Sequence, residues 1–398
     1  MSMQVRRHAV TISMSSRNRR ATRKFYVPFL LLTLPAFSID AQVAPPDQNS
    51  FWVSEPEIIT APDGRTLQPR AINDVGQVIG TDDTYTHSFL WSRKSGYKDL
   101  GDVAVWGINN CGETTGTLVK VRHAYRQFGG AIEDLGTLEP NNPDAWSEGR
   151  AINERGDVVG YASRDVAGNI EVVGFLWTRA NGMVALTEPG FYSSADAINN
   201  RRQIAGSKQR ELLNGLGVAA FWENTTLIWT GGLGGRFFNA RGLNEFGAIT
   251  ASGDTGNYYG PLRSSIYWSA STDLKELSPP GGPVDYWLEI GADAYDIDDR
   301  GRIAGAVNQS TEISNWYLQA AVWTSPSEYH VLSARPSGAI GINNVGDVIG
   351  YVDAAADGSA AGGPVIWRIR TPVDGTLGKA AQATAHGLAI CRIRRLRN

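Results

Sequence analysis

The sequence predicts an all-β fold, a seven-bladed β-propeller with four strands in each blade, and three observations support this prediction. The phrase A-I-N-D-V-G-Q-V-I-G at residues 71–80 recurs six more times along the chain with variations. The copies are about 35 to 55 residues apart, a period typical of propellers and solenoids. Each copy contains the signals of several short strands, and the segment before the first copy supplies a strand that the last copy lacks. An open β-solenoid is the alternative.

The repeated phrase predicts a β-hairpin. In the third copy, Ala151 and Ile152 end one strand, residues 153–156 form the turn, and Val158 begins the next strand. An asparagine at the first turn position can bond its own backbone, and the glycine three residues later supplies a left-handed conformation, for example Gly76, Gly156 and Gly346. The first turn position is occupied by Asn73, Asn109, Asn153, Asn199, Asn244, Asp298 and Asn343.

Arg202 replaces the turn glycine in the fourth copy. We expect it to keep the positive φ of the turn, at a cost on the order of 1 kcal/mol. A second small residue ends the returning strand in every copy, as Gly80, Gly160 and Ala251 illustrate, and we expect it to face the aromatic side chain of the neighbouring strand.

The third strand of six copies ends in tryptophan. These residues are Trp91, Trp177, Trp222, Trp268, Trp323 and Trp367. The second copy has no tryptophan, so we expect its blade to pack more loosely. A fourth strand follows in most copies, as at residues 99–101 and 274–277. The last copy has none, and we expect residues 53–60 to pair with the strand ending at Trp367 and so close the ring.

The two ends of the chain differ from the repeats. Residues 1–41 combine seven basic side chains, an apolar run at residues 25–37 and a small residue, Ala41, which is the pattern of a signal peptide. The run is short and interrupted by proline, so we expect no transmembrane segment in the mature chain. Residues 42–370 form the predicted propeller, and residues 371–398 are predicted to be a flexible basic tail. Secretion, or retention in the periplasm of a bacterial cell envelope, is therefore expected.

Charge argues against a nucleic-acid partner. Removing the signal peptide takes away seven basic residues and one acidic residue, which changes the net charge from −3 to about −9. An acidic body repels phosphates. The two cysteines, Cys111 and Cys391, are too few for a disulfide framework or a cysteine metal site.

No residue set in the sequence predicts a catalytic, cofactor or metal site. Asp296 and Asp298 resemble part of a calcium loop, but Arg300 stands where a third oxygen ligand belongs. The histidines are scattered, and no nucleophile elbow, phosphate loop or zinc signature is present. The asparagines of the turns are interpreted as turn caps.

Function is expected in the segments that do not repeat. The stretches between the second and third strands vary in length and should all lie on one face of a propeller, where binding is usually located. Those of the fifth and sixth copies, with the connection between them, contain aromatic residues suited to stacking on sugars or anchoring a protein. These candidate ligand-binding residues are Tyr258, Tyr259, Tyr286, Trp287, Trp316 and Tyr317. An alternative interpretation is that they only cover two enlarged blades.

The repeat, including His87-Ser88-Phe89-Leu90-Trp91, resembles the HAF repeat of bacterial extracellular proteins over residues 52–370. The resemblance implies export and a repeat architecture, and it transfers no catalytic residue. We therefore expect an exported binding or interaction scaffold, for a glycan or a cell-surface protein. The alternatives are a carbohydrate-active hydrolase or lyase, which needs paired carboxylates such as Asp254 and Glu312 in one pocket, and a self-associating surface protein.

Overall fold

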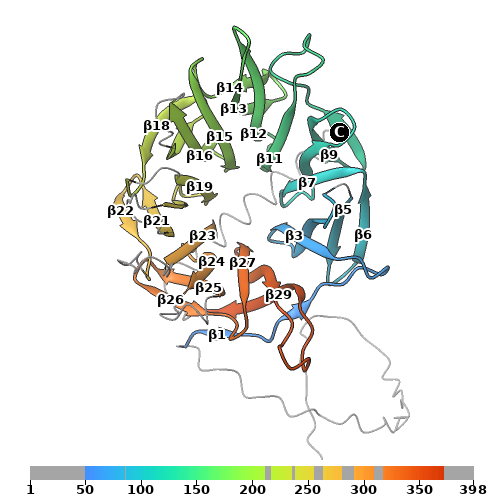
Figure 1. Cartoon of the computed structure of the whole chain (residues 1–398), viewed down its shortest axis with the longest axis vertical. Helices are drawn as coiled ribbons and strands as arrows, with labels where there is room; N and C mark the ends of the chain where they lie inside the picture. Colours follow the sequence, from blue (N-terminus) through green and yellow to red (C-terminus); the bar gives the residue numbers. More distant parts are fainter. Residues whose placement is uncertain are drawn as a thin grey trace, which may run out of the picture. The chain divides into compact units, whose positions relative to one another are not determined.

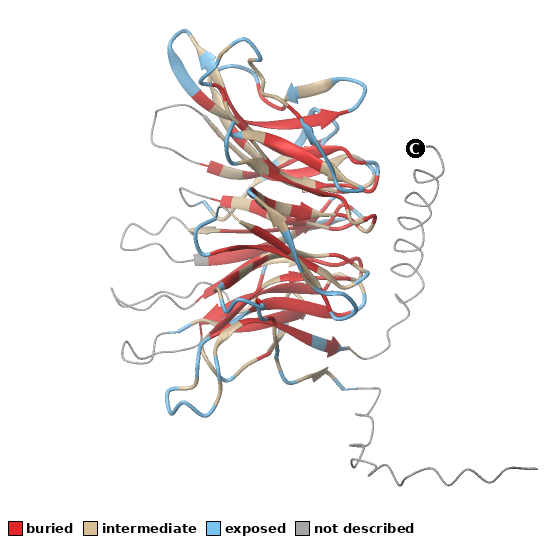
Figure 2. Ribbon diagram, turned by 90° about the vertical axis from the view of Figure 1, so that its right-hand side faces the viewer, coloured by how far each residue is buried: buried red, intermediate tan, exposed pale blue. Residues whose placement is uncertain are grey.

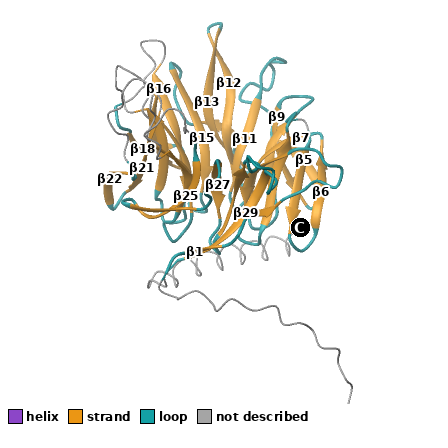
Figure 3. Ribbon diagram, turned by 60° about the horizontal axis from the view of Figure 1, so that its bottom comes forward, coloured by secondary structure: helices purple, strands orange, loops and turns teal. Residues whose placement is uncertain are grey.

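The structure, a computed structural model, describes residues 50–85, 87–210, 217–234, 238–254, 263–279, 291–308 and 317–371. Within these residues, seven antiparallel sheets stand around a ring, and each sheet is one blade (Figure 1). The described residues form strands and loops and contain no helix (Figure 3). The chain is a seven-bladed β-propeller, which confirms the predicted fold class.

Each blade has the same strand order from the centre outward. The inner strands are β3 (Leu67–Ile72), β7 (Val103–Ile108), β11 (Ser147–Ile152), β15 (Phe191–Ile198), β19 (Phe238–Leu243), β23 (Gly291–Ile297) and β27 (Ser337–Ile342). The second strands are β4 (Gln77–Asp82), β8 (Thr114–Leu118), β12 (Val158–Val166), β16 (Gln203–Arg210), β20 (Ile249–Asp254), β24 (Ile303–Asn308) and β28 (Asp347–Val352).

The outer half of each blade follows the same plan. The third strands are β5 (Ser88–Ser92), β9 (His123–Phe128), β13 (Asn169–Thr178), β17 (Gly217–Glu223), β21 (Arg263–Ser269), β25 (Gln319–Ser325) and β29 (Gly363–Arg370). The outer strands of the first six blades are β6 (Gly96–Gly101), β10 (Ala131–Asp134), β14 (Gly182–Ala185), β18 (Thr226–Gly231), β22 (Thr272–Glu276) and β26 (Glu328–Val331).

The N-terminal segment completes the seventh blade. The strands β1 (Trp52–Val53) and β2 (Glu57–Ile58) both pair antiparallel with β29, with Val53 opposite Ile369 and Ile58 opposite Val365. This pairing confirms the predicted closure of the ring. Because the first and last parts of the chain share one blade, the sheet edge that an open array would leave is covered.

The core lies between neighbouring blades. Trp367 and Val348 of the seventh blade form one buried cluster with Ala304 and Val322 of the sixth. Five of the six tryptophans that end a third strand are buried, namely Trp177, Trp222, Trp268, Trp323 and Trp367, and Trp91 is partly buried against the core. Figure 2 shows the buried residues concentrated in the strands and the exposed ones in the connecting loops.

The second blade replaces the missing tryptophan with polar pairs. Gln127 occupies the tryptophan position opposite Thr114, whose hydroxyl lies 3.2 Å from the Gln127 side-chain oxygen. Beside them, buried Arg126 forms a 3.0 Å ion pair with buried Glu113. The interior of this blade is therefore held by hydrogen bonds where the other blades use an indole ring.

The repeated turns have the predicted conformation. In the first copy, the backbone N–H of Gly76 donates to the carbonyl of Asn73, and the N–H of Gln77 donates to the Asn73 side-chain oxygen at 2.9 Å. Gly76 has a φ of +76°. Arg202 has a φ of +61°, which confirms that the fourth turn keeps the left-handed conformation without glycine.

The second small residue faces a backbone carbonyl, and the prediction that it faces an aromatic ring is wrong for most copies. A Cβ added to Gly160 would lie 1.8 Å from the carbonyl oxygen of Glu148, and one added to Gly206 would lie 2.0 Å from that of Ser194. An aromatic atom of the neighbouring strand also lies within 3 Å of the added Cβ at two positions, Gly80, where it belongs to Phe89, and Gly305, where it belongs to Trp323. The carbonyl comes close because it precedes a β-bulge in the inner strand.

Residues 161–173, the variable stretch expected between the second and third strands of the third copy, form an extended hairpin. The strands β12 and β13 continue to Val166 and from Asn169, joined by a turn with positive φ at both Ala167 and Gly168. Arg164 and Glu171 form an ion pair across this hairpin. The predicted signal peptide, residues 1–41, and the predicted tail beyond Thr371 lie outside the described residues.

Candidate functional site

Every inner strand contains a β-bulge at the same repeat position. The pairing with the second strand shifts by one residue there, so one residue of each inner strand has no partner opposite. This residue directly precedes the repeated phrase in most copies. The seven bulge residues are Arg70, Trp106, Arg150, Asp196, Arg241, Tyr295 and Ile340.

All seven bulge residues line one cavity of about 700 Å³, which we call the central cavity. The inner strands surround the centre of the ring (Figure 1). Each inner strand runs from the loop face, where the second and third strands are joined, to the turn face, where the asparagine turns lie. The bulge residues precede the turns by three positions, so the central cavity lies on the loop-face side of the turns. A cavity of this volume suits a small ligand.

Three arginines in the central cavity are held against aromatic rings. The Cζ atoms of Arg70 and Arg150 lie 4.5 and 4.3 Å from the centroid of the Trp106 ring. The Cζ atom of Arg241 lies 4.9 Å from the Tyr295 centroid. Cation–π contacts of this length fix a guanidinium while its edge N–H groups stay available to a carboxylate or phosphate.

The positive charges of the cavity are only partly neutralised. Arg150 lies 3.1 Å from Glu148 and 3.7 Å from Asp196. Arg70 and Arg241 form no salt bridge with any residue that the structure describes. The cavity is therefore suited to an anion.

Unpartnered polar atoms also line the central cavity. The Nε atom of Arg70, the indole nitrogen of Trp106 and the side-chain oxygen of Asn239 are buried and have no hydrogen-bond partner among the described residues. Buried polar groups are normally hydrogen-bonded, so these atoms indicate positions where a ligand or water would complete the bonding. Two are donors and one is an acceptor.

One carboxyl group of the cavity has a perturbed pKa. Burial raises the pKa of Asp296 to about 7, against a smaller lowering by the backbone N–H groups of Ile342 and Ile297. These N–H groups donate to its two oxygens at 3.0 and 2.9 Å. Asp296 thus has a structural role between the sixth and seventh blades, and it is partly protonated near neutral pH.

A layer of aliphatic side chains separates the central cavity from the turns. It consists of the residues before the turn asparagines, which are Ile72, Ile108, Ile152, Ile198, Leu243, Ile297 and Ile342. Ile108, Ile152 and Ile198 line both the central cavity and a smaller cavity of about 160 Å³ at the turns. The aliphatic layer therefore separates two chemically different compartments, the central cavity and the smaller cavity at the turns.

The turn asparagines link the blades into a ring. The Asn73 side-chain amide donates to the Asn109 carbonyl at 2.9 Å, and Asn109 donates to the Asn153 carbonyl at 2.8 Å. The series closes where Asn343 donates to the Asn73 carbonyl at 2.9 Å. The sequence predicts only the cap of each asparagine on its own turn. The bond to the next blade was missed because it depends on the ring geometry.

Asp298 interrupts this series because a carboxylate has no proton to donate. Arg302 is bonded to the Asp298 carboxylate at 2.6 Å, and its guanidinium donates to the Asn343 carbonyl at 3.4 Å. The arginine thus supplies the donor that asparagine supplies in the other blades. The oxygens of Asp298 are directed to Arg302 and to backbone N–H groups.

A second closed ring lies beside the first, which we call the acidic ring. Each backbone N–H of its members donates to a side-chain oxygen of the next member, at 2.7 to 3.1 Å. The members are Asp74, Asn110, Glu154, Asn200, Glu245, Asp299 and Asn344. Burial raises the pKa of Glu154 and of Asp299 to about 7, and neighbouring carboxylates add to the rise. The described residues contain no group of three or more His, Cys, Asp or Glu side chains placed to hold a metal ion.

The aromatic residues predicted as a ligand site are largely untested. Tyr258, Tyr259, Tyr286, Trp287 and Trp316 lie outside the described residues. Tyr317 is described, is 37% exposed and is not part of the central cavity. The bulge residues were missed, although the sequence contains a signal for them: the position before a constant phrase changes from arginine to tryptophan, aspartate, tyrosine or isoleucine.

The fold and the cavity define the chain as a seven-bladed β-propeller with a polar central cavity. Its structure is similar to virginiamycin B lyase from Staphylococcus aureus, with a TM-score of 0.50 and 14% identity over 81% of this chain and 99% of that one. It is also similar to a puromycin hydrolase variant, with a TM-score of 0.50 and 11% identity over 74% of this chain and 51% of that one.

At identities this low, the similarity shows the fold alone. No protein-family model matches the sequence. No curated protein matches it. The resemblance to the HAF repeat stays a prediction. Among the described residues, no helix has the length and apolarity needed to cross a membrane.

Proposed function

We propose that this chain is an exported binding protein whose central cavity holds a small acidic saccharide. The observation that carries the proposal is the convergence of Arg70, Arg150 and Arg241, from three separate blades, in one cavity of about 700 Å³. Arginine is the residue best suited to bind a carboxylate through two parallel hydrogen bonds.

The remaining polar groups of the cavity favour a ligand with hydroxyl groups as well. The unpartnered indole N–H of Trp106 requires an acceptor, and the unpartnered oxygen of Asn239 requires a donor. A hydroxyl group provides both functions. A sugar acid combines carboxylate and hydroxyl groups in one small molecule, which is why this class is proposed over a simple anion.

Calorimetry with trigalacturonate, and with neutral galactotriose as its counterpart, tests the proposal. We expect binding of the acidic trisaccharide only. Arg241→Gln should weaken this binding by about 10- to 100-fold, the range for loss of a hydrogen bond to a charged group. The matched control is Arg201→Gln, because Arg201 is an exposed arginine of a turn and lies outside the central cavity. Equal binding of the neutral and acidic sugars, or no effect of Arg241→Gln, would reject the proposal.

Export is proposed from residues 1–41 and is supported by the chemistry of Cys111, which is disulfide-bonded. Disulfides persist mainly in oxidising compartments outside the cytosol. N-terminal sequencing of the protein secreted or released from the periplasm of a bacterial host should begin at Gln42. A cytosolic protein that retains Met1 would contradict export.

The second candidate is a hydrolase or lyase that acts on the same saccharide. It is favoured by two carboxyl groups from different blades, Asp196 and Asp296, in one cavity, because a carboxyl group with a pKa of about 7 can act as a general acid at neutral pH. Chromatography of trigalacturonate after incubation with the protein distinguishes the two functions. Cleavage that is lost in Asp196→Asn while binding persists would establish the enzyme.

A further inference from the structure

Arginines and aromatic rings alternate along one wall of the central cavity, and we call this series the cation–π row. Its members, in the order of their contacts, are Tyr85, Arg70, Trp106, Arg150 and Tyr161. Each of the two arginines has its Cζ atom between 4.3 and 5.9 Å from the centroids of two rings. The row joins the first three blades, and each group in it is held by its neighbours.

The row leads out of the central cavity at the first blade. Arg70, Trp106, Arg150 and Tyr161 line the cavity. Tyr85 does not line it, because it lies in the connection between β4 and β5, on the loop face, and is 46% exposed. A ligand that contacts both Arg70 and the exposed part of the Tyr85 ring must therefore extend beyond the cavity.

The opposite end of the row is closed by packing. Tyr161 is half-buried, and the Trp146 ring meets it edge to face with the two centroids 6.1 Å apart. The Tyr161 hydroxyl donates to the Glu148 carboxylate at 2.7 Å, and the negative charge of Glu148 repels an anion. The first blade is therefore the end of the row at which an acidic ligand can continue.

The two arginines of the row have different partners at equivalent repeat positions. The side-chain oxygen of Gln68 accepts from Arg70 at 3.2 Å and from the Tyr85 hydroxyl at 3.1 Å. Glu148 takes the place of Gln68 in the third blade and accepts from Arg150 at 3.1 Å. Because Gln68 is neutral and Glu148 is a carboxylate, only the charge of Arg150 is partly neutralised on its own strand. A ligand carboxylate is therefore attracted more strongly to Arg70.

Tyr85 is held in an unusual backbone conformation. Its φ is +59°, in the left-handed region that bulky residues rarely adopt. Such conformations persist where the surrounding structure fixes them, and they are concentrated at ligand sites. The hydrogen bond to Gln68 and the contact with Arg70 fix the Tyr85 ring, so its exposed surface is preset for stacking. Asp82 and Asp83 shortly precede Tyr85, so stacking and not charge would hold a sugar there.

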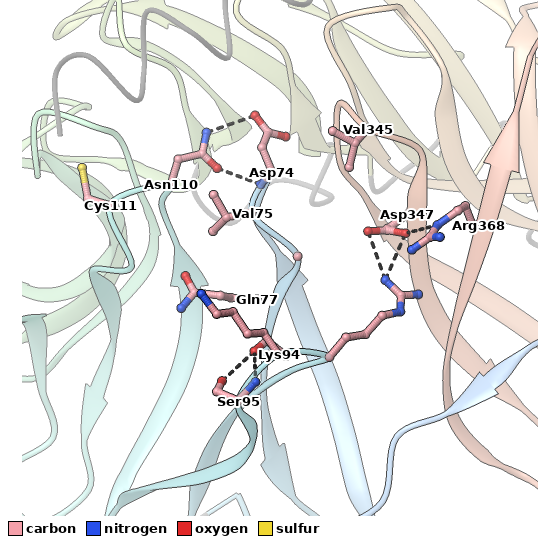
Figure 4. Close-up of a pocket in the computed structure, with 13 residues that line it drawn as sticks. Asp74, Val75, Gln77, Lys94, Ser95, Asn110, Cys111, Val345, Asp347 and Arg368 are labelled. Atoms are coloured by element: carbon pink, nitrogen blue, oxygen red, sulfur yellow. Dashed lines mark hydrogen bonds and ion pairs between the residues drawn. The ribbon is translucent and has the colours of Figure 1, made fainter. Parts of the chain in front are cut away.

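A large groove on the turn face lacks this arrangement. It has a volume of about 680 Å³, and both of its arginines, Arg93 and Arg368, lie 3.3 Å from Asp347 (Figure 4). The described residues that line it include no aromatic ring. Stacked arginines without a carboxylate partner thus distinguish the central cavity from this groove.

We propose that Tyr85 forms an outer subsite, which stacks on a sugar residue next to the one held in the central cavity, with a ligand carboxylate at Arg70. The ligand is then an acidic oligosaccharide, or the end of an acidic polysaccharide, that enters from the loop face at the first blade. This inference rests on the proposed function, because it takes an acidic saccharide as the ligand of the cavity.

Calorimetry with galacturonate and trigalacturonate tests the outer subsite on the full chain. We expect the wild type to bind the trisaccharide at least about tenfold more tightly than the monosaccharide. Tyr85→Asn removes the ring, and asparagine tolerates the positive φ, so this variant should bind the trisaccharide about 3- to 10-fold more weakly and the monosaccharide unchanged. Tyr85→Phe keeps the ring and should bind as the wild type does. The matched control is Phe246→Asn, because Phe246 is 42% exposed and lies in a turn on the opposite face.

The outcomes separate the outer subsite from the proposed function. Equal affinity of the wild type for both sugars, or an equal effect of Tyr85→Asn and Phe246→Asn, would overturn the outer subsite. If Arg241→Gln weakens trigalacturonate binding and Tyr85→Asn does not, the proposed function stands and the outer subsite is refuted. If neither sugar binds, the proposed function is rejected and the outer subsite with it.

A pair of substitutions tests the position of the ligand carboxylate. Gln68→Glu gives Arg70 the carboxylate neighbour that Arg150 has, and it should weaken trigalacturonate binding by about tenfold. Glu148→Gln removes this neighbour from Arg150 and should bind no more weakly than the wild type. Weaker binding by Glu148→Gln, or unchanged binding by Gln68→Glu, would overturn the assignment of the carboxylate to Arg70.

Discussion

Replacing Glu154 with glutamine is expected to stabilise the protein at alkaline pH and to leave it unchanged at acid pH. Glu154 is buried, and burial is the main cause of the rise of its pKa from 4.5 to about 7. Glutamine keeps the oxygen that accepts the 2.9 Å hydrogen bond from the Asn110 backbone and has no charge to desolvate. Asp299→Asn is a poorer test, because its new amide would face the Asn344 amide that now donates to Asp299.

The sign and size of the effect follow from proton linkage. The folded state binds the Glu154 proton more tightly than the unfolded state, so this group's contribution to stability is fully present below about pH 4.5 and is lost as the pH rises through about 7. A difference of about 2.5 pKa units corresponds to about 3 kcal/mol. At pH 8 the Glu154→Gln variant should therefore have a free energy of unfolding about 3 kcal/mol above that of the wild type.

Urea denaturation at pH 4.5, 6 and 8 measures the difference. The advantage of Glu154→Gln should be within about 0.5 kcal/mol of zero at pH 4.5, intermediate at pH 6 and complete at pH 8. Glu55→Gln is the control, because Glu55 is exposed and lies outside the acidic ring. The same difference at pH 4.5 and 8, or a variant less stable than the wild type at pH 8, would refute the reasoning.

Three further predictions concern the scaffold, each measured by denaturation at pH 7. Gly160→Ala should destabilise the protein by about 3 kcal/mol or more, because the new Cβ meets the Glu148 carbonyl at 1.8 Å; a loss below 1 kcal/mol would mean that the bulge can relax. Asn199→Asp should cost about 2 kcal/mol of stability, because it removes the 3.0 Å hydrogen bond to the Asn244 carbonyl. Adding Gln203→Arg should recover part of this loss, because the pair then copies Asp298 and Arg302. No recovery would contradict the proposed role of Arg302 as the replacement donor. Arg202→Gly relieves about 1 kcal/mol of backbone strain but removes the hydrogen bonds at 2.7 and 3.1 Å to buried Asp157. We therefore expect the free energy of unfolding to fall by about 1 kcal/mol. A more stable variant would show that the strain is the larger effect.

The sequence predicted those features of the fold that depend on neighbouring residues. The turn conformation follows from Asn73 and Gly76, which are three residues apart. The pairing of residues 53–60 is the exception, because it was predicted from a strand that is missing in the last copy. The hydrogen bonds between blades could not be predicted, because Asn73 and Asn109 meet only after the ring has closed. The prediction that Gly160 faces an aromatic ring was wrong for a similar cause. The carbonyl that approaches Gly160 belongs to a β-bulge, and a bulge leaves no clear pattern in the sequence of one repeat.

The candidate site could be predicted only in kind. The sequence predicts that function lies in unrepeated residues, and the bulge residues are unrepeated. However, the sequence directed attention to the long aromatic loops instead. Arg70, Arg150 and Arg241 were overlooked because each is a single residue at the edge of a constant phrase. Their common position becomes meaningful only when the inner strands are seen to converge.

The β-bulge in each inner strand has a consequence for how such a ring can diversify. A bulge residue has no pairing partner opposite, so its side chain can be exchanged without disturbing the hydrogen bonds that hold the blade. Seven such positions line one cavity, so the side chains that contact a ligand can change while the strands and turns of the scaffold stay the same. Relatives with the same turns and different bulge residues would be expected to share the architecture and to select different ligands.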